Sequence, residues 1–313
     1  MRKNIVIIES ASENGAGKRG ASLGPSALVL ESRAQGLDLF DNIEWTQCSE
    51  FNDFYNPNNE NQHAKNAGSV YKALDALCTH TEKIVQAGHF PLVLTGDHSN
   101  AIGSFSGLKN AFPDKRIGAI WVDAHYDLHS PYTSPSGNIH GMPLNALIGD
   151  DNKEQQCNEV SESDKGYWEN IKSLGNKQIS PKINPEDIVF IQVRDFEKPE
   201  EHMAKKHNIR SFFPSEVNSK GITAVLEETL DYLSSCDMIY VSFDVDCQDT
   251  SISVGTGTPV PNGLNSEESQ IVFDQLFNHP KVAAFEITEI NPLLDTENKM
   301  AKAVLKLLTG VLN

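Results

Sequence analysis

The chain has 313 residues, of which 39% are hydrophobic and 22% are charged, and its formal net charge is −17. This composition suits an ordinary globular protein with a sizeable core and excludes a disordered chain. The acidic balance argues against nucleic acid or an anionic membrane as a partner, because both favour basic surfaces. The five cysteines are scattered without a CxxC pair and no apolar run is long enough to span a membrane, so we expect free thiols and a cytoplasmic protein.

Strands and helices alternate along the sequence. In chain order we expect a strand at 5–8, a helix at 69–86, strands at 91–94 and 117–122, a short helix at 167–174, a strand at 188–193, a helix at 221–234, strands at 238–243 and 282–287, and a helix at 296–308. The strand runs are continuously apolar, which is typical of parallel strands covered on both faces. We therefore predict one domain over residues 1–313 with an α/β fold, a three-layer α/β/α sandwich around a mostly parallel central sheet.

Acidic residues and histidines follow four of the predicted strands. In chain order these segments are Asp97-His98, Asp123-Ala-His125-Tyr-Asp127, Arg194-Asp-Phe-Glu197 and Asp244-Val-Asp246. Because the carboxyl ends of parallel strands lie at one edge of the sheet, where open α/β folds bind their ligands, we expect the four segments to converge on one crevice.

So dense a cluster of carboxylates needs a counter-charge, because like charges and burial both oppose ionisation. A multivalent cation would supply it, and six ligands suit two ions better than one. The six candidate ligands are His98, Asp123, His125, Asp127, Asp244 and Asp246. Coordination rich in carboxylate and free of thiolate favours Mn²⁺, with iron, cobalt, nickel or zinc as alternatives. Two such ions share a water molecule and lower its pKa, so that hydroxide forms near neutral pH.

Each segment taken alone also has a structural interpretation. Asp97-His98-Ser99 by itself is more typical of a helix N-cap, and Asp244-Val-Asp246 by itself is more typical of a turn. The pattern Asp-x-His-x-Asp after a buried strand is more specific. The three segments together favour the metal centre.

These segments resemble the three metal motifs of the ureohydrolase family. They read Thr95-Gly-Asp-His-Ser99, Trp121-Val-Asp-Ala-His-Tyr-Asp127 and Ser242-Phe-Asp-Val-Asp246. The resemblance extends from Gly20 to Pro292, most of the chain. Within the family, the loop Ser136-Gly-Asn-Ile-His-Gly141 is most similar to the arginase loop that holds the α-amino acid end of the substrate.

The resemblance implies an arginase-like fold and the hydrolysis of L-arginine to L-ornithine and urea, by attack of a hydroxide that bridges two Mn²⁺ on the guanidinium carbon. One ion would be held by His98, Asp123, Asp127 and Asp244, and the other by Asp123, His125, Asp244 and Asp246. The implied catalytic residues are Asp127, His140 as an acid or proton shuttle, and Glu289 as the guanidinium ligand. Ser136 and Asn138 would line the α-carboxylate site, with Thr258 beside the guanidinium. A homo-oligomer, trimer or hexamer, is also implied.

Two positions depart from the arginase pattern. His129 stands where asparagine usually contacts the substrate carboxylate, and it retains a hydrogen-bond donor. Glu197 stands where aspartate usually holds the α-amino group, and either Glu200 or Glu201 could assist it. The alternatives are therefore another ureohydrolase, such as a formimidoylglutamase, agmatinase or guanidino-acid hydrolase, then a single-zinc deacetylase on the related fold, and a non-catalytic regulator.

Overall fold

The computed structural model describes residues 4–52 and 61–312 of the chain. Within these residues lies one eight-stranded sheet whose neighbouring strands are all parallel. The strands are β1 (Ile5–Ser10), β2 (Glu44–Gln47), β3 (Phe90–Thr95), β4 (Ile117–Val122), β5 (Ile188–Ile191), β6 (Arg210–Phe212), β7 (Met238–Asp244) and β8 (Val282–Thr288). Their order across the sheet is β2-β1-β3-β8-β7-β4-β5-β6.

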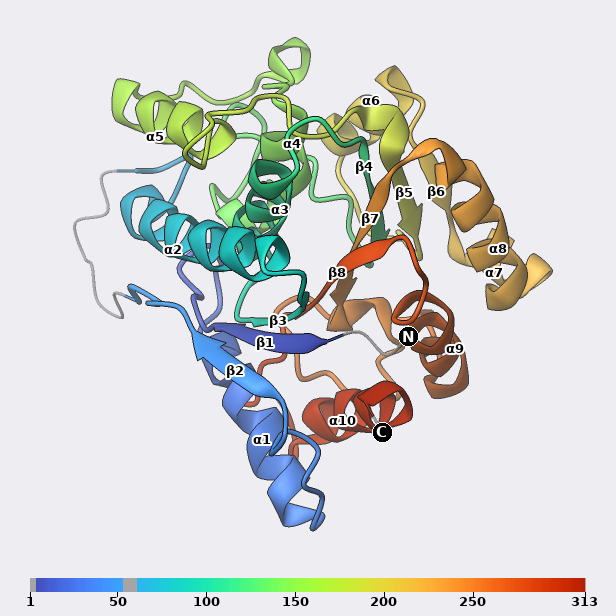
Figure 1. Ribbon diagram of the computed structural model, residues 1–313. Helices are drawn as coiled ribbons and strands as arrows, with labels where there is room; N and C mark the ends of the chain where they lie inside the picture. The colour runs from blue at the N-terminus through green and yellow to red at the C-terminus, as the bar shows by residue number, and fades with distance from the viewer. Residues whose placement is uncertain (1–3, 53–60, 313) are drawn as a thin grey trace.

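Helices cover both faces of the sheet and form the outer layers of the sandwich (Figure 1). The α-helices of the described residues are α1 (Gly24–Ala34), α2 (Ala67–Gln86), α3 (Ala101–Ala111), α4 (Pro143–Ile148), α5 (Glu162–Lys172), α6 (Lys198–Lys206), α7 (Pro214–Lys220), α8 (Ile222–Tyr232), α9 (Ser266–Leu276) and α10 (Lys299–Leu312). Buried side chains of α2 to α6 pack with Trp121 and Tyr240 on one face of the sheet. Those of α1 and α7 to α10 pack with Ile120 and Val241 on the other face. Successive strand residues thus enter two different cores, which explains why the strand runs are continuously apolar.

The predicted α/β class is confirmed, and the sheet is entirely rather than mostly parallel within the described residues. All six predicted strands are present, and the helices predicted at 69–86, 221–234 and 296–308 correspond to α2, α8 and α10. The short helix predicted at 167–174 starts earlier, as α5. Ser161 sets that start, because its hydroxyl accepts a hydrogen bond from the Asp164 backbone N–H at 3.1 Å.

The strands β2 and β6 at the two edges of the sheet were not predicted. β2 carries exposed Glu44 and Gln47 at its ends, so it lacks the apolar run that identifies the inner strands. β6 has only three residues. Edge strands are often short and polar, and such strands leave little periodic signal in a sequence.

The strand order explains where the functional segments meet. β3, β8, β7, β4 and β5 are consecutive neighbours in the sheet, although they lie far apart in the chain. The segments that carry the candidate ligands follow β3, β4 and β7, Glu289 follows β8, and Glu197 follows β5. All of them therefore lie at the carboxyl ends of the parallel strands, on the same side of the sheet, as predicted.

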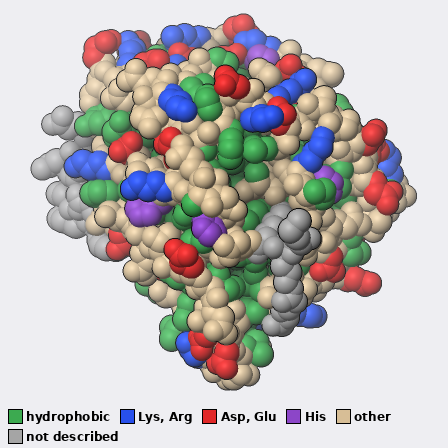
Figure 2. Space-filling model, in the orientation of Figure 1, with side chains coloured by type: hydrophobic (Ala, Val, Ile, Leu, Met, Phe, Trp, Pro, Cys, Tyr) green, Lys and Arg blue, Asp and Glu red, His purple; other side chains and the backbone are tan. Residues whose placement is uncertain are grey.

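The surface gives no further identification by itself. No helix among residues 4–52 and 61–312 is long and apolar enough to cross a membrane. On the face of the molecule drawn in Figure 2, Lys and Arg side chains are interspersed with Asp and Glu side chains. The absence of nucleic-acid and membrane partners stays a prediction.

Candidate metal centre and substrate pocket

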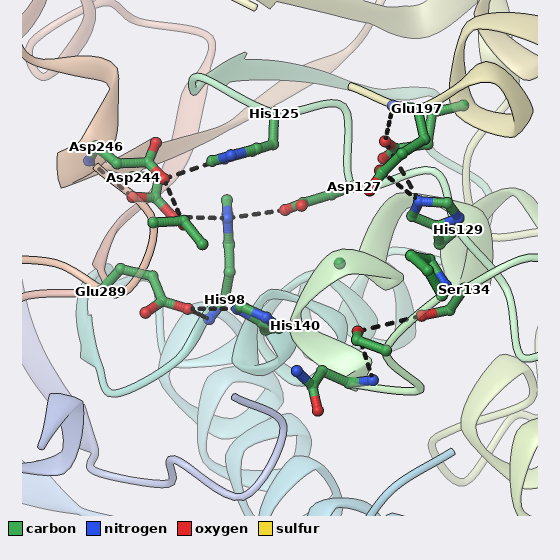
Figure 3. A pocket seen from close by; sticks show the side chains of 16 residues that line it. His98, His125, Asp127, His129, Ser134, His140, Glu197, Asp244, Asp246 and Glu289 are labelled. Carbon is green, nitrogen blue, oxygen red and sulfur yellow. Dashed lines mark hydrogen bonds and ion pairs between the residues drawn. The ribbon is translucent and has the colours of Figure 1, made fainter. Parts of the chain in front are cut away.

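Three carboxylates surround one nitrogen atom of His98. His98 Nδ1 lies 3.0 Å from Asp123 Oδ2, 2.9 Å from Asp127 Oδ2 and 3.1 Å from Asp244 Oδ2. The four side chains come from the ends of β3, β4 and β7. Figure 3 shows Asp127 and Asp244 on either side of His98. A ring nitrogen carries at most one proton, so it cannot satisfy three carboxylate oxygens.

A second cluster adjoins the first and shares Asp123 with it. His125 Nδ1 lies 3.1 Å from Asp246 Oδ2 and 3.4 Å from Asp123 Oδ1. Asp123 thus turns one oxygen toward His98 and the other toward His125. Either cluster could hold a metal ion, because each offers three donor atoms close together. The predicted six ligands are therefore brought together as two overlapping sets.

The chemistry of these donors fits divalent cations. The Oδ2 atoms of Asp123 and Asp127 are buried and accept no hydrogen bond within the described residues. Burial and the charges of Asp246 and Asp123 raise the pKa of Asp244 well above its ordinary value. Buried carboxylates in which an oxygen atom accepts no hydrogen bond are unfavourable as anions unless a cation neutralises them.

Local hydrogen bonds fold the two aspartate segments. Asp123 Oδ1 accepts a hydrogen bond from the His125 backbone N–H at 2.7 Å, and Asp244 Oδ1 accepts one from the Asp246 N–H at 2.8 Å. In each segment the first carboxylate turns the chain so that the ligand two residues later faces the same centre. The turn interpretation of Asp244-Val-Asp246 is therefore confirmed, and it is compatible with the metal interpretation, which stays a prediction.

The N-cap interpretation is correct for Asp97 but not for its neighbour. Asp97 accepts hydrogen bonds from the Ser99 backbone N–H at 2.8 Å and from the Gly15 N–H at 2.7 Å, so it organises the loop rather than the ligand set. This places the ring of His98 against the candidate metal ligands Asp123, Asp127 and Asp244. The ring of His98 also stacks on Trp121, with 4.4 Å between the ring centroids.

Glu289 and His140 form the inner wall of the pocket beside the metal centre. Glu289 Oε1 accepts a hydrogen bond from the His98 backbone N–H at 3.0 Å and lies 3.2 Å from His140 Nδ1. Burial alone would lower the pKa of His140, but its contact with Glu289 raises that pKa above the ordinary value. Thr258 Oγ1 donates to Asp246 Oδ2 at 3.1 Å, so Thr258 also lies at this wall.

Two of the expected catalytic carboxylates have strained backbones. Asp127 has φ of +54° and Glu289 has φ of +67°, in the left-handed region that residues other than glycine rarely adopt. Both residues are buried, at 6% and 3% exposure. Strain of this kind is common in active sites, where surrounding contacts hold a side chain in a required direction.

The two residues that depart from the arginase pattern contact each other. His129 Nε2 lies 2.8 Å from Glu197 Oε2 and 3.4 Å from Glu200 Oε2. The hydrogen bond from His129 lowers the pKa of Glu197 to about 2, whereas burial raises the pKa of Glu200 to about 7. Glu200 is buried in the pocket wall, and Glu201 pairs with Lys205 instead, so the structure favours Glu200 as the assisting acid.

The loop with Ser136 and Asn138 closes the opposite wall of the pocket. Ser136 Oγ accepts a hydrogen bond from the Asn138 backbone N–H at 3.2 Å and lies 3.4 Å from Ser134 Oγ. Gly137 has φ of +71°, and a Cβ atom there would lie 2.1 Å from the Gln62 carbonyl oxygen, so only glycine fits.

Most of the predicted site residues line this one pocket, which has a cavity of about 130 Å³. Asp123 is the exception: it does not line the cavity, although it contacts both His98 and His125. Sequence reasoning missed Ser134 and left Glu200 undecided. The lining residues are His98, His125, Asp127, His129, Ser134, Pro135, Ser136, Asn138, His140, Gly141, Glu197, Glu200, Asp244, Asp246, Thr258 and Glu289.

The three-layer α/β/α fold and this cluster of carboxylates and histidines define a hydrolase of the metal-dependent class. The family described as "Arginase family" matches residues 3–312, and the chain belongs to that family. The arginase of Bacillus subtilis strain 168 is 34% identical over all of this chain and 98% of its own length. A structure of Entamoeba histolytica arginase in complex with L-ornithine has a TM-score of 0.83 at 26% identity and covers 99% of both chains. These similarities confirm the predicted fold class and the predicted hydrolase of arginase type.

A more distant similarity supports the fold alone. The formimidoylglutamase of Bacillus subtilis has a TM-score of 0.73 at 19% identity, with coverage of 98% of this chain and 85% of its own. The alternative ureohydrolase activity is therefore less well supported than the arginase activity.

Proposed function

We propose that the protein hydrolyses L-arginine to L-ornithine and urea at a centre of two Mn²⁺. The observation that carries this proposal is the pair of clusters that share Asp123, next to a pocket walled by Glu289 and by the loop around Ser136. Glu289 lies beside the two clusters and could bind a guanidinium group there. The loop around Ser136 offers polar groups that could bind the amino acid end of a substrate. The arginases among the relatives support the same reaction.

Six residues would hold the ions. His98, Asp123, Asp127 and Asp244 would bind one ion, and Asp123, His125, Asp244 and Asp246 would bind the other. When bound, the pair supplies a shared water of lowered pKa, which makes hydroxide available near neutral pH. The donors fit this role, since all are carboxylates or imidazoles and the set contains no thiolate.

Glu289 would bind and orient the guanidinium group. A guanidinium presents two parallel N–H groups to a carboxylate, which gives both charge complementarity and direction. Glu289 Oε1 already accepts from His98, and this contact holds the carboxylate beside the metal centre. The strained backbone of Glu289 serves the same end, because it turns the side chain into the pocket.

Asp127 and His140 would move protons. Asp127 lines the pocket beside the candidate ligands, where its carboxylate could accept a proton from the attacking water and deliver it to the leaving amine. His140 lies beside Glu289 and is about one-fifth exposed, so it could exchange a proton between the pocket and solvent.

The outer pocket would hold the α-amino acid end of the substrate. His129, Ser136 and Asn138 offer donors for the carboxylate, and Glu197 offers a carboxylate for the ammonium group. Because His129 and Glu197 already pair with each other, the substrate would enter between two groups of complementary charge.

The test is urea release from L-arginine by the Mn²⁺-loaded chain, with metal content measured on the same sample. The panel also contains agmatine, guanidino acids and N-formimino-L-glutamate, compared by kcat/KM. We expect two Mn²⁺ per chain and the highest kcat/KM for L-arginine. A chain that binds two ions but prefers another substrate would support the alternative ureohydrolase, and one without hydrolysis of any of them would contradict the proposal.

Two further parts of the proposal concern the whole protein. We expect a homo-oligomer, trimer or hexamer, which light scattering of the purified chain would measure. We also expect the protein to be cytoplasmic, which cell fractionation would test. Both expectations depend on the family resemblance and on the composition of the chain.

A further inference from the structure

A buried carboxylate with no role in the proposed reaction lies behind the metal centre. Glu286 of β8 has 0% exposure. The hydroxyl of Tyr240 donates to Glu286 Oε2 at 2.7 Å, and Thr95 Oγ1 donates to Oε1 at 3.2 Å. Ser104 Oγ of α3 donates to Oε2 as well. Burial raises the pKa of Glu286, and the hydrogen bonds from these hydroxyls oppose that rise.

Two side chains of β7, Tyr240 and Ser242, lie between Glu286 and His98. The Nδ1 atom of His98 faces the carboxylates of the metal centre, whereas its Nε2 atom lies 2.7 Å from Ser242 Oγ. Ser242 lies two residues after Tyr240 in β7, so the two side chains project from the same face of the strand, and Tyr240 in turn contacts Glu286. Ser242 and Glu286 are also register partners across β7 and β8, so the backbone fixes their separation.

The protons along this chain of contacts have one consistent direction. A histidine that binds metal through Nδ1 carries its proton on Nε2, so His98 would donate to Ser242 Oγ. Ser242 can then direct its own proton toward Tyr240, the neighbouring side chain on the same face of β7, and Tyr240 gives its proton to Glu286. The series of hydrogen bonds ends at Glu286, because an ionised carboxylate can accept hydrogen bonds but cannot donate one. Tyr240 keeps its proton, since burial and the charge of Glu286 raise its pKa well above the ordinary value.

We propose that Glu286 and Tyr240 are positioning residues that hold His98 in the tautomer and orientation needed to bind a metal ion. They act through Ser242 and touch neither substrate nor metal ligand carboxylates. This inference rests on the proposed function in one respect, the use of His98 as a metal ligand. Groups that fix metal-binding histidines in this way typically change metal affinity about 10- to 100-fold when removed.

The experiment measures Mn²⁺ binding rather than catalysis. The chain is freed of metal by a chelator and titrated with Mn²⁺, and the free ion is counted by its electron paramagnetic resonance signal. We expect Glu286→Gln and Tyr240→Phe each to weaken one of the two ions about 10- to 100-fold and to leave the other unchanged. Because both residues serve one chain of contacts, the double variant should bind no more weakly than Glu286→Gln alone.

Asp187→Asn is the matched control. Asp187 is also a buried carboxylate with several hydrogen bonds, to Arg116, but it precedes β5 at the opposite edge of the sheet from the metal centre. We expect this variant to lose stability in thermal unfolding and to bind both ions as the wild type does. It therefore separates the loss of a buried carboxylate from the loss of the link to His98.

Several results would overturn the inference. A folded Glu286→Gln chain that binds both ions with wild-type affinity would do so, and so would an equal loss of both ions. If Glu286→Gln does not fold, Tyr240→Phe decides, because it removes a single oxygen atom. A wild-type chain that binds no Mn²⁺ would contradict the proposed function itself. A wild-type chain that binds two ions, with variants that bind them equally well, would contradict only the inference about Glu286 and Tyr240.

Discussion

Replacement of Glu289 by glutamine is the most direct test of how the guanidinium is bound. The substitution keeps the volume of the side chain and removes its charge, while Oε1 can still accept from the His98 backbone N–H. A hydrogen bond to a charged group contributes about 1.5–3 kcal/mol, and Glu289 is only 3% exposed, so solvent screens it little. We therefore expect kcat/KM for L-arginine to fall about 10- to 150-fold.

The assay compares urea release from three substrates that share the guanidinium group. L-Arginine, agmatine, which lacks the carboxylate, and 5-guanidinopentanoate, which lacks the amino group, should all lose kcat/KM by a similar factor. Mn²⁺ content should not change, because Glu289 is not a predicted ligand. Glu13→Gln is the control, since Glu13 is also buried but accepts from the Gly20 and Ser22 N–H groups. A Glu289→Gln chain that keeps wild-type kcat/KM with full Mn²⁺ content would refute the reasoning.

Three further predictions follow from other parts of the structure. Glu197→Gln should raise KM for L-arginine about 2- to 5-fold, a small effect because the Glu197 side chain is more than half exposed, and should leave KM for 5-guanidinopentanoate unchanged. Removal of metal by a chelator should lower Tm, and Mn²⁺ at about 100 times its Kd should restore about 2.7 kcal/mol per site; an unchanged Tm would contradict the predicted link between the ions and the fold. Burial lowers the pKa of Lys182 from 10.5 to about 8, so the folded state binds fewer protons than the unfolded state between these values and wild-type stability rises with pH there. Lys182→Met should therefore increase the free energy of unfolding at pH 7 by up to about 3 kcal/mol, and urea unfolding should show this gain shrinking from pH 8 to 10.5.

The sequence predicted the inner strands and the metal ligands for the same physical reason. An inner strand of a parallel sheet contacts helices on both faces, so its residues are apolar throughout and the run is visible. The polar ligands begin where such a run ends, as Asp123 does directly after Val122. The edge strands β2 and β6 lack this signal because, among residues 4–52 and 61–312, each has a neighbouring strand on one side only.

Contacts between distant loops could not be predicted in this way. The pairing of His129 with Glu197 joins the segments after β4 and β5, and the sequence indicated only that each residue was unusual. The choice of Glu200 over Glu201 depends on which side of α6 faces the pocket. The left-handed backbones of Asp127 and Glu289 also have no sequence signal, because residues other than glycine adopt that conformation only in a few per cent of cases.

These unpredicted features all lie in the loops that follow the carboxyl ends of the strands. Without ions, this end of the sheet must bury the carboxylates of Asp123, Asp127 and Asp244 around a single histidine nitrogen, which burial and like charges both oppose. It must also hold the strained backbones of Asp127 and Glu289. The hydrophobic cores on the two faces of the sheet offset the cost of the buried carboxylates and the cost of the strained backbones, since each inner strand packs against helices on either side. Metal binding should therefore order the loops at this end far more than the sheet, and hydrogen exchange of the amides at Asp127 and Glu289 should slow most when Mn²⁺ is added.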